Sequence, residues 1–352
     1  MFTSTDRYII WTCIGVFNVV GLFGNCNVIY AHYRLPSLRT KYGMLLTLLV
    51  SSQSFCLLYE WVGVLYALSG EIILRLFCFR LLSPYVFMHC VQSGLMAAIS
   101  TDLLLSITMP IRHRLMSMHC YLLLYLIPIF CYAASVLITA ELTMEEKIIP
   151  VCQPPLSLPY IANRLWYFVA LLLNGVVVIT YITTFALIKK RRGRKKRLED
   201  DSDVEAKALK SLSVLLLMFL CTRFWSTAIS NIMNFAGASR EAIDWVHGYA
   251  IIPALTCYSS SFYVCIFRSR EYRKIFSPQI SRFLATFGVK VDRRFLYRDA
   301  TDCSIKYRSN RTPSRDLPSL INNSPLEITG SQLRMFISPL VVSEGSTSPN
   351  RA

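Results

Sequence analysis

Four side chains in the apolar stretches of this chain carry groups that could bind a ligand. Glu60 and Arg223 are ionisable, and Tyr85 and His89 are polar aromatic residues. Ionisable groups are costly in a lipid environment, so they usually face a protein interior and have a function. Tyr85 and His89 are four residues apart, which places them on one helix face. We expect these four residues to line a pocket; a Glu60–Arg223 ion pair that only stabilises packing is the alternative.

The chain lacks a recognisable catalytic constellation. It has no pair of histidines at helical spacing in an apolar stretch, no paired aspartates there and no Gly-Ser nucleophile turn. His32, His113 and His119 belong to predicted connections or helix ends, where a lone histidine is more often solvated. We therefore expect a protein that is not an enzyme and that holds no metal or other cofactor.

The elements that must position these residues are long apolar segments. Of the 352 residues, 54% are hydrophobic and 16% are charged, with a mean hydropathy of +0.43. A helix needs about 20 apolar residues to cross a bilayer, and open strands would leave backbone groups unsatisfied in lipid. We predict an all-α membrane protein, a bundle of seven transmembrane helices. The predicted spans cover residues 8–31, 42–68, 81–109, 115–140, 165–188, 211–235 and 245–267.

The basic residues indicate the orientation of the bundle. The chain has a net charge of +16, and its Lys and Arg residues gather on alternate connections. Connections one, three and five and the segment after the last span carry 19 of them, against 6 on the opposite side. The positive-inside rule therefore predicts an extracellular N-terminus, residues 1–7, and a cytoplasmic C-terminus. The charge excess is a topology signal, so we expect no nucleic-acid partner.

Only two of the twelve cysteines fall on the predicted outer side away from the spans, Cys78 and Cys152. Disulfides form in oxidising surroundings such as the cell exterior. The sequence therefore predicts a disulfide between the start of span three and the connection after span four. Two free outer thiols are the alternative.

The segments around and after the last spans should lie on the cytoplasmic side. The block KKRRGRKKR, which begins at Lys189, can rest on anionic lipid headgroups or continue a helix toward a protein partner. RSREYRKIF, which ends at Phe276, has the pattern of a short amphipathic eighth helix on the membrane surface. Residues 8–276 thus form the membrane domain, and the Ser- and Pro-rich residues 277–352 form a mostly disordered tail.

The polar residues of the spans also have a familiar spacing. Gly24-Asn25 stands in span one with Gln53 28 residues later, and Asp102-Leu103-Leu104 follows Cys78 by 24 residues. In these intervals the chain resembles the rhodopsin-like G-protein-coupled receptors, and most closely the nematode serpentine chemoreceptors of the Srsx type. The resemblance covers about residues 8–276. It implies a Cys78–Cys152 disulfide and a set of residues for conformational switching and G-protein coupling. These are Asn25, Gln53, Asp102, Tyr181, Ser261 and Cys265.

The chain departs from the family pattern at several of these positions. Gln53 stands where most rhodopsin-like receptors have an Asp that helps to hold sodium, and the Arg expected after Asp102 is absent. Arg223 occupies the place of the switch tryptophan and Trp225 that of the kinking proline, so span six should be straighter. Because this Arg is missing, Asp102 is expected to pair in the resting state with basic side chains of the second or third cytoplasmic connection.

These observations together predict a chemosensory receptor at the plasma membrane, with the cilium of a sensory neuron as one candidate location. Its expected partners are an extracellular small molecule or peptide, a heterotrimeric G protein and membrane lipids. Aminergic receptors carry an Asp where Tyr85 stands, so an amine is a poor candidate for the ligand. If Glu60 does not neutralise Arg223, this arginine favours an anionic ligand group. Two alternatives stay open: a seven-span ligand-gated channel with a cytoplasmic N-terminus, and a transporter or scaffold without signalling.

Overall fold

The protein is a bundle of long helices in the computed structural model. The structure describes residues 4–69, 73–149, 152–195, 251–268 and 276, with isolated positions between 217 and 250. All of them belong to a unit formed by residues Met1–Leu296. Within these described residues, five helices are long and apolar enough to cross a membrane: α1 (Ser4–Arg34), α2 (Lys41–Ser69), α3 (Arg75–Thr108), α5 (Met118–Leu142) and α7 (Tyr160–Lys195). A shorter apolar helix, α11 (Ile251–Arg268), lies beside them.

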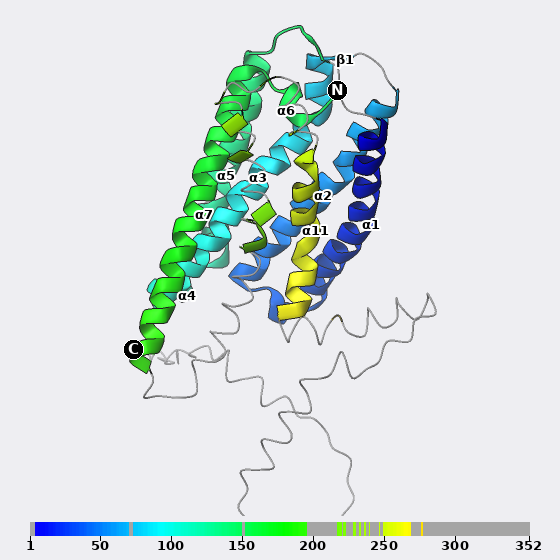
Figure 1. Ribbon diagram of the computed structural model, residues 1–352. Helices are drawn as coiled ribbons and strands as arrows, with labels where there is room; N and C mark the ends of the chain where they lie inside the picture. Colours follow the sequence, from blue (N-terminus) through cyan, green and yellow to red (C-terminus); the bar gives the residue numbers. More distant parts are fainter. Residues whose placement is uncertain are drawn as a thin grey trace, which may run out of the picture. The chain divides into compact units, whose positions relative to one another are not determined.

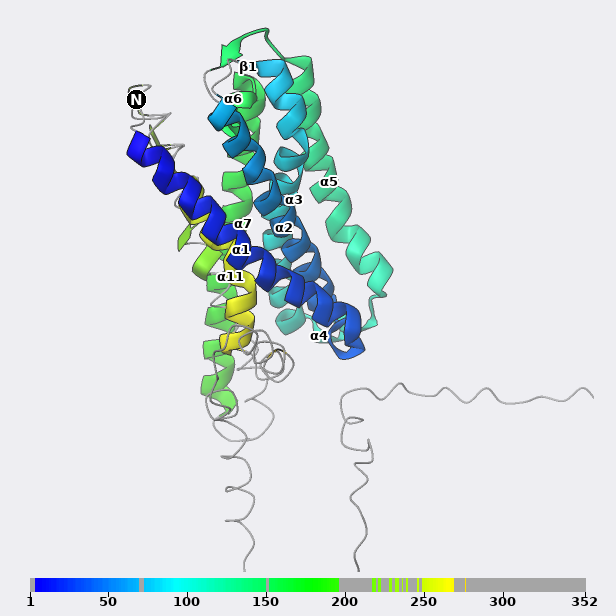
Figure 2. The ribbon, with the colours of Figure 1, turned by 90° about the vertical axis from the view of Figure 1, so that its right-hand side faces the viewer.

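Helix α3 occupies the centre of the bundle. It contacts α2, α5 and α7, whereas α1 packs against α2 and α11 (Figures 1 and 2). Two small elements, β1 (Ile73–Leu74) and α6 (Pro154–Ser157), lie at one end, and α4 (Pro110–Leu115) lies at the other (Figure 1). We call these the lid end and the α4 end. From Val91 to Ser100 every residue of α3 is buried, as expected for a helix surrounded by others.

The lid is built from β1, β2 (Ile148–Ile149) and α6, and a disulfide fastens it to the bundle. The strands pair antiparallel, with Ile73 opposite Ile149 and Leu74 opposite Ile148. Cys78 in the first turn of α3 is bonded to Cys152 at an S–S distance of 2.09 Å. The predicted disulfide is therefore confirmed. The two-stranded sheet is a departure from the all-α expectation, and it is confined to the connections between helices.

Several predicted span boundaries need correction. Span three begins at Arg75 instead of residue 81, because Arg75 and Arg80 bind Glu145 and Glu141 at the surface of the bundle. Span four begins at Met118, since the chain from Pro110 to Leu115 forms the separate helix α4. Helix α7 continues to Lys195, into the basic block.

Parts of four predictions lie outside the described residues. These are most of span six, most of the start of span seven, the eighth helix apart from Arg268 and Phe276, and the tail. The described portion of span seven, α11, agrees with the prediction.

Helices α1 and α11 approach closely because α1 presents glycines to α11. A Cβ atom on Gly24 would lie 2.8 Å from the Cβ of Phe262, and one on Gly21 would lie 2.5 Å from the Oγ of Ser259. The Oγ of Ser259 donates a hydrogen bond to the carbonyl of Phe17 at 3.2 Å. Small residues that let backbones approach are typical of helix pairs in membranes.

Candidate functional site

A buried carboxyl group lies between α2, α3 and α11 toward the lid end. The hydroxyl of Tyr85 donates a hydrogen bond to Oε1 of Glu60 at 2.8 Å and lies 3.5 Å from the hydroxyl of Tyr258. All three side chains are buried. Within the described part of the chain, no basic side chain pairs with Glu60. A ligand group could therefore complete the polar contacts of this carboxyl group.

His89 extends this cluster toward α7. Its ring lies 6.0 Å from the ring of Tyr85 and 4.8 Å, edge to face, from that of Trp166. The hydroxyl of Tyr132 donates to the carbonyl of Trp166 at 3.2 Å, which joins α5 to the same region. The indole nitrogen of Trp166 is buried and has no hydrogen-bond partner among the described residues. The structure thus brings together three of the four predicted pocket residues, Glu60, Tyr85 and His89.

Arg223, the fourth predicted pocket residue, lies outside the described residues, as does Trp225. The Glu60–Arg223 ion pair therefore stays a prediction.

A second polar group links α1, α2 and α11 near the middle of the bundle. The Oγ of Ser261 donates to Oε1 of Gln53 at 2.9 Å, and Nδ2 of Asn25 donates to the carbonyl of Tyr258 at 3.1 Å. Tyr258 therefore contacts both groups, with its hydroxyl near Tyr85 and its carbonyl bound to Asn25. Three of the predicted switch residues, Asn25, Gln53 and Ser261, are thus held in one hydrogen-bonded region.

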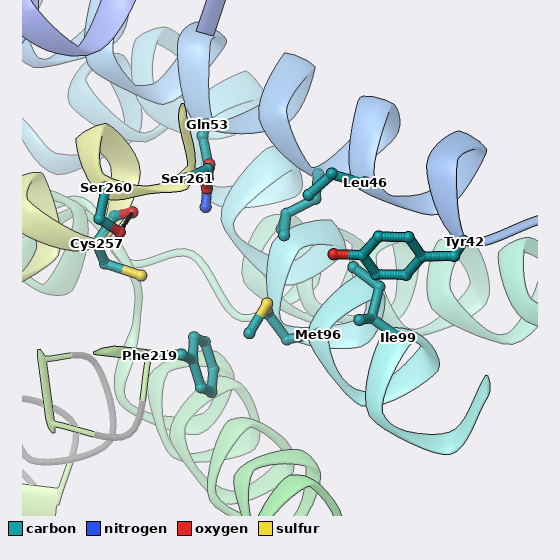
Figure 3. Close-up of a pocket in the computed structure, with 10 residues that line it drawn as sticks. Tyr42, Leu46, Gln53, Met96, Ile99, Phe219, Cys257, Ser260 and Ser261 are labelled. Carbon is teal, nitrogen blue, oxygen red and sulfur yellow. Dashed lines mark hydrogen bonds between the residues drawn. The ribbon is translucent and has the colours of Figure 1, made fainter. Parts of the chain in front are cut away.

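A small cavity opens beside Gln53 and Ser261. Measured to the centre of a water-sized sphere its volume is about 20 Å³, enough for a water molecule. Figure 3 shows Gln53, Met96 and Phe219 around it, with Tyr42 farther along. The lining combines an amide, hydroxyl groups and sulfur atoms and includes no acidic side chain.

A third polar group joins four elements at the α4 end. Oδ1 of Asp102 lies 2.7 Å from Nε2 of His113, and both side chains are largely buried. The ammonium group of Lys41 donates to the carbonyl of His113 and lies over the ring of Tyr121. The prediction that Asp102 pairs with a base of the second inner connection is consistent with this contact. The expectation that His113 is solvated is wrong, because α4 folds back onto α3.

The other predicted residues are more widely distributed. His32 is also buried, with Nδ1 3.0 Å from the carbonyl of Val28, whereas His119 is exposed as expected. Cys265 is buried in a separate apolar cluster with Phe262. Tyr181 is half-buried against the main core. Among the described residues, the side chains of Tyr181 and Cys265 form none of the hydrogen bonds described above.

Tyr258, Trp166 and His113 take part in these groups although the sequence did not predict them as site residues. Tyr258 and Trp166 are aromatic residues with a polar atom inside apolar spans, which is a signal that could have identified them. His113 offered no such signal, because its contact with Asp102 depends on the direction in which α4 leaves α3.

The sequence profile of the family described as serpentine type 7TM GPCR chemoreceptor Srsx matches residues 18–280, which include all the polar groups described above. No curated protein matches the chain.

Proposed function

Because the chain belongs to the Srsx family of serpentine seven-transmembrane GPCR chemoreceptors, we propose that it is a G-protein-coupled receptor for an external small molecule or peptide. The protein is a multi-pass membrane protein. In this proposal the lid end faces the exterior and the α4 end faces the cytoplasm, in agreement with the charge distribution. The receptor acts at the plasma membrane, and the cilium of a sensory neuron is the location to examine first.

The observation that carries this proposal is the buried Glu60–Tyr85 contact beside His89 and Trp166. Ligand-binding sites combine a mainly apolar lining with a small number of polar groups that orient the ligand. We place the ligand in this cluster, beneath the lid. Arg223 is the predicted fourth contact and would select an anionic group through paired hydrogen bonds.

Ligand binding can shift the receptor only if the two helix arrangements bind the ligand with different affinity. Tyr258 offers a physical connection for such a shift, since it contacts Tyr85 at the ligand cluster and Asn25 at the middle group. From there Gln53 and Ser261 link α2 to α11. We propose that Asn25, Gln53 and Ser261 transmit the change and that Asp102, Tyr181 and Cys265 act near the G protein.

The pocket is tested first by finding an agonist. A chemical screen with calcium and cyclic-nucleotide readouts in receptor-expressing cells supplies it, and its affinity is then measured on purified receptor. We expect Tyr85→Phe to weaken binding about tenfold through loss of one hydrogen bond to a charged or polar group. Arg223→Ala should weaken the binding of an anionic agonist by at least the same factor. The matched control is Tyr33→Phe, because Tyr33 is an exposed tyrosine in the last turn of α1, away from this cluster.

G-protein coupling and orientation need separate measurements. Agonist-dependent nucleotide exchange on heterotrimers in reconstituted membranes supports coupling, and its absence with every heterotrimer favours the scaffold alternative. A tag at Met1 should be accessible on intact cells. If the tag reacts only after permeabilisation, the proposed orientation is wrong and the channel alternative returns.

Unchanged agonist affinity in both Tyr85→Phe and Arg223→Ala would mean that the ligand binds elsewhere.

A further inference from the structure

Two polar atoms in the first two turns of α7 are buried and have no hydrogen-bond partner among the described residues. They are Nε1 of Trp166, a donor, and Oδ1 of Asn163, an acceptor. The whole side chain of Trp166 is buried, since the residue is 4% exposed. Buried polar atoms in proteins are nearly always paired, so a donor and an acceptor left unpaired one helical turn apart require an explanation.

The two unpaired atoms belong to the α7 side of the cluster in which we place the ligand. Asn163 and Trp166 are three residues apart, so they share one face of α7 and are separated by about 4.5 Å along its axis. Trp166 faces α3, where the ring of His89 meets its ring edge to face at 4.8 Å. His89 in turn lies beside Tyr85, with the ring centres 6.0 Å apart.

Neighbouring aromatic residues orient the indole of Trp166. The ring of Tyr167 stacks on it at a distance of 5.1 Å between the ring centres. The hydroxyl of Tyr132 on α5 donates to the backbone carbonyl of Trp166 at 3.2 Å and thereby fixes this turn of α7. The indole N–H is therefore a donor in a preorganised position, as binding sites require.

This face of α7 favours an uncharged binding partner. Arg164, the basic residue between Asn163 and Trp166 in the sequence, is exposed, and its guanidinium group lies over the ring of Tyr160 at 5.3 Å. A charged group buried against Trp166 would lose its hydration without gaining a counter-charge from the described residues. A neutral group that carries both an acceptor and a donor matches the two unpaired atoms without this cost.

We propose that Trp166 and Asn163 form a subsite that binds a neutral amide group of the ligand. The indole N–H of Trp166 donates to the amide carbonyl, and Oδ1 of Asn163 accepts a hydrogen bond from the amide N–H. We call these two residues the amide subsite. The inference rests on the proposed function, because it assigns a chemical group to the ligand of the same cluster. It narrows the expected ligand to a small amide or a short peptide.

A series of three probes of nearly equal shape tests the amide subsite without a known agonist. Benzamide offers an acceptor and a donor, acetophenone offers the acceptor alone, and isopropylbenzene offers neither. Each probe is titrated against purified receptor in nanodiscs with isotope-labelled tryptophan, and the indole N–H resonance of Trp166 is identified by its loss in Trp166→Phe. We expect the affinity to fall by about three- to tenfold at each step of the series, the value of one hydrogen bond. Benzamide and acetophenone should shift the resonance downfield, and isopropylbenzene should not.

Two variants assign the two halves of the subsite. Asn163→Leu should abolish the preference for benzamide over acetophenone and leave the affinity for acetophenone near the wild-type value. Trp166→Phe should abolish the preference for acetophenone over isopropylbenzene. Because each preference compares two probes on the same variant, a general loss of stability does not produce the expected result.

Matched control variants are available on two other helices. Asn27→Leu removes an amide whose Nδ2 donates to the carbonyl of Phe23 in its own helix, α1. Trp61→Phe replaces a tryptophan of α2 that is 42% exposed. Both control variants should keep both preferences.

Two results would overturn the amide subsite. One is equal affinity of the wild-type receptor for the three probes, or preferences that persist in both Asn163→Leu and Trp166→Phe. The other is a Trp166 resonance that has the position of a hydrogen-bonded indole before any probe is added and that no probe shifts. Water alone would then satisfy the two atoms.

A longer probe identifies the source of the amide. N-acetylphenylalaninamide carries two amide groups in the arrangement of a peptide backbone. Tighter binding than that of benzamide, together with a loss in Tyr85→Phe that benzamide does not show, supports a peptide that extends from Trp166 past His89. Equal affinity of the two probes supports a small amide. The amide subsite stands in both cases.

The amide subsite and the proposed function can fail separately. If the wild-type receptor shows both preferences but activates no heterotrimer with any agonist, the proposed signalling is wrong and the subsite stands. If an agonist without an amide drives nucleotide exchange and the three probes bind equally, the subsite is wrong and the proposed function stands.

Discussion

The two ends of the bundle are held together by different chemistry. At the lid end a disulfide, a two-stranded sheet and surface ion pairs join the connections to α3. At the α4 end the connection between α3 and α5 is held by polar contacts of Asp102, His113 and Lys41. A covalent bond does not open on the timescale of signalling, whereas hydrogen-bonded contacts can.

This difference suggests a division of roles within the receptor. The lid end is fixed by covalent and sheet contacts, close to the cluster of Glu60 and Tyr85 in which we propose that the ligand binds. The α4 end is held by polar contacts that a partner could replace, as the proposed activation would require. Substitutions that remove each kind of contact, ordered by their expected effect, test this comparison.

Removal of the disulfide should have the largest effect. Cys78→Ser removes the covalent link between two residues that are 74 positions apart in the sequence. Cross-links of this kind stabilise proteins by about 2–5 kcal/mol, mainly by restricting the unfolded chain. We expect a clear fall in the melting temperature of the purified receptor and poor delivery to the cell surface. The exposed free cysteine Cys26 supplies the control variant Cys26→Ser.

A Cys78→Ser receptor as stable as Cys26→Ser would remove the basis for calling the lid end fixed. Peptide mapping without reduction should also recover Cys78 joined to Cys152 in wild type.

The close contact between α1 and α11 ranks next. Gly24→Ala would place a methyl group 2.8 Å from the Cβ of Phe262, so α1 and α11 would have to separate. Overpacking of this kind costs about 1–3 kcal/mol. Gly175→Ala on α7 is the matched control, since no atom lies within 4 Å of the added methyl group. Thermal unfolding of the two variants in parallel should show a loss only for Gly24→Ala; equal behaviour would mean that α1 is loosely packed.

The sequence predicted the helical fold well, because a long apolar segment in lipid has only the helix to satisfy its backbone. It placed the start of α3 too late, because Arg75 and Arg80 resemble the end of a span. In the structure their charges are met by Glu145 and Glu141. The lid sheet could not be predicted. Its two-residue strands carry no periodic pattern, and the paired residues, Ile73 with Ile149 and Leu74 with Ile148, lie far apart in the sequence.

The sites show the same limit. The pairing of Tyr85 with His89 followed from helical spacing, and Cys78 with Cys152 from their common side of the membrane. Tyr85 with Glu60 and Ser261 with Gln53 join different helices, so their contacts depend on how those helices rotate against each other. His113 lies after the break at Met109, where the spacing rules of a single helix no longer apply.

Loss of the hydrogen bond between α11 and α2 should have a smaller effect. Ser261→Ala leaves Oε1 of Gln53 without its donor, but the adjacent cavity has room for a water molecule that can replace it. The expected cost is about 1 kcal/mol, that of an ordinary hydrogen bond. Ser260→Ala, which removes only a bond to the carbonyl of Cys257 in the same helix, is the control. A loss in Ser261→Ala several times larger would indicate that water does not enter the cavity.

The smallest effect is expected at the surface of the lid end. Arg80 donates from Nη2 to Oε1 of Glu141 at 3.0 Å, and both side chains are about half exposed or more. Exposed ion pairs contribute no more than about 1 kcal/mol, because water and salt screen them. Arg80→Gln should therefore lower the melting temperature only slightly in low salt and not at all in 0.5 M salt. A large, salt-independent fall in the melting temperature would show that this ion pair, together with the disulfide, fixes the lid end. The two ends would then differ in the strength of their polar contacts and not in the kind of contact.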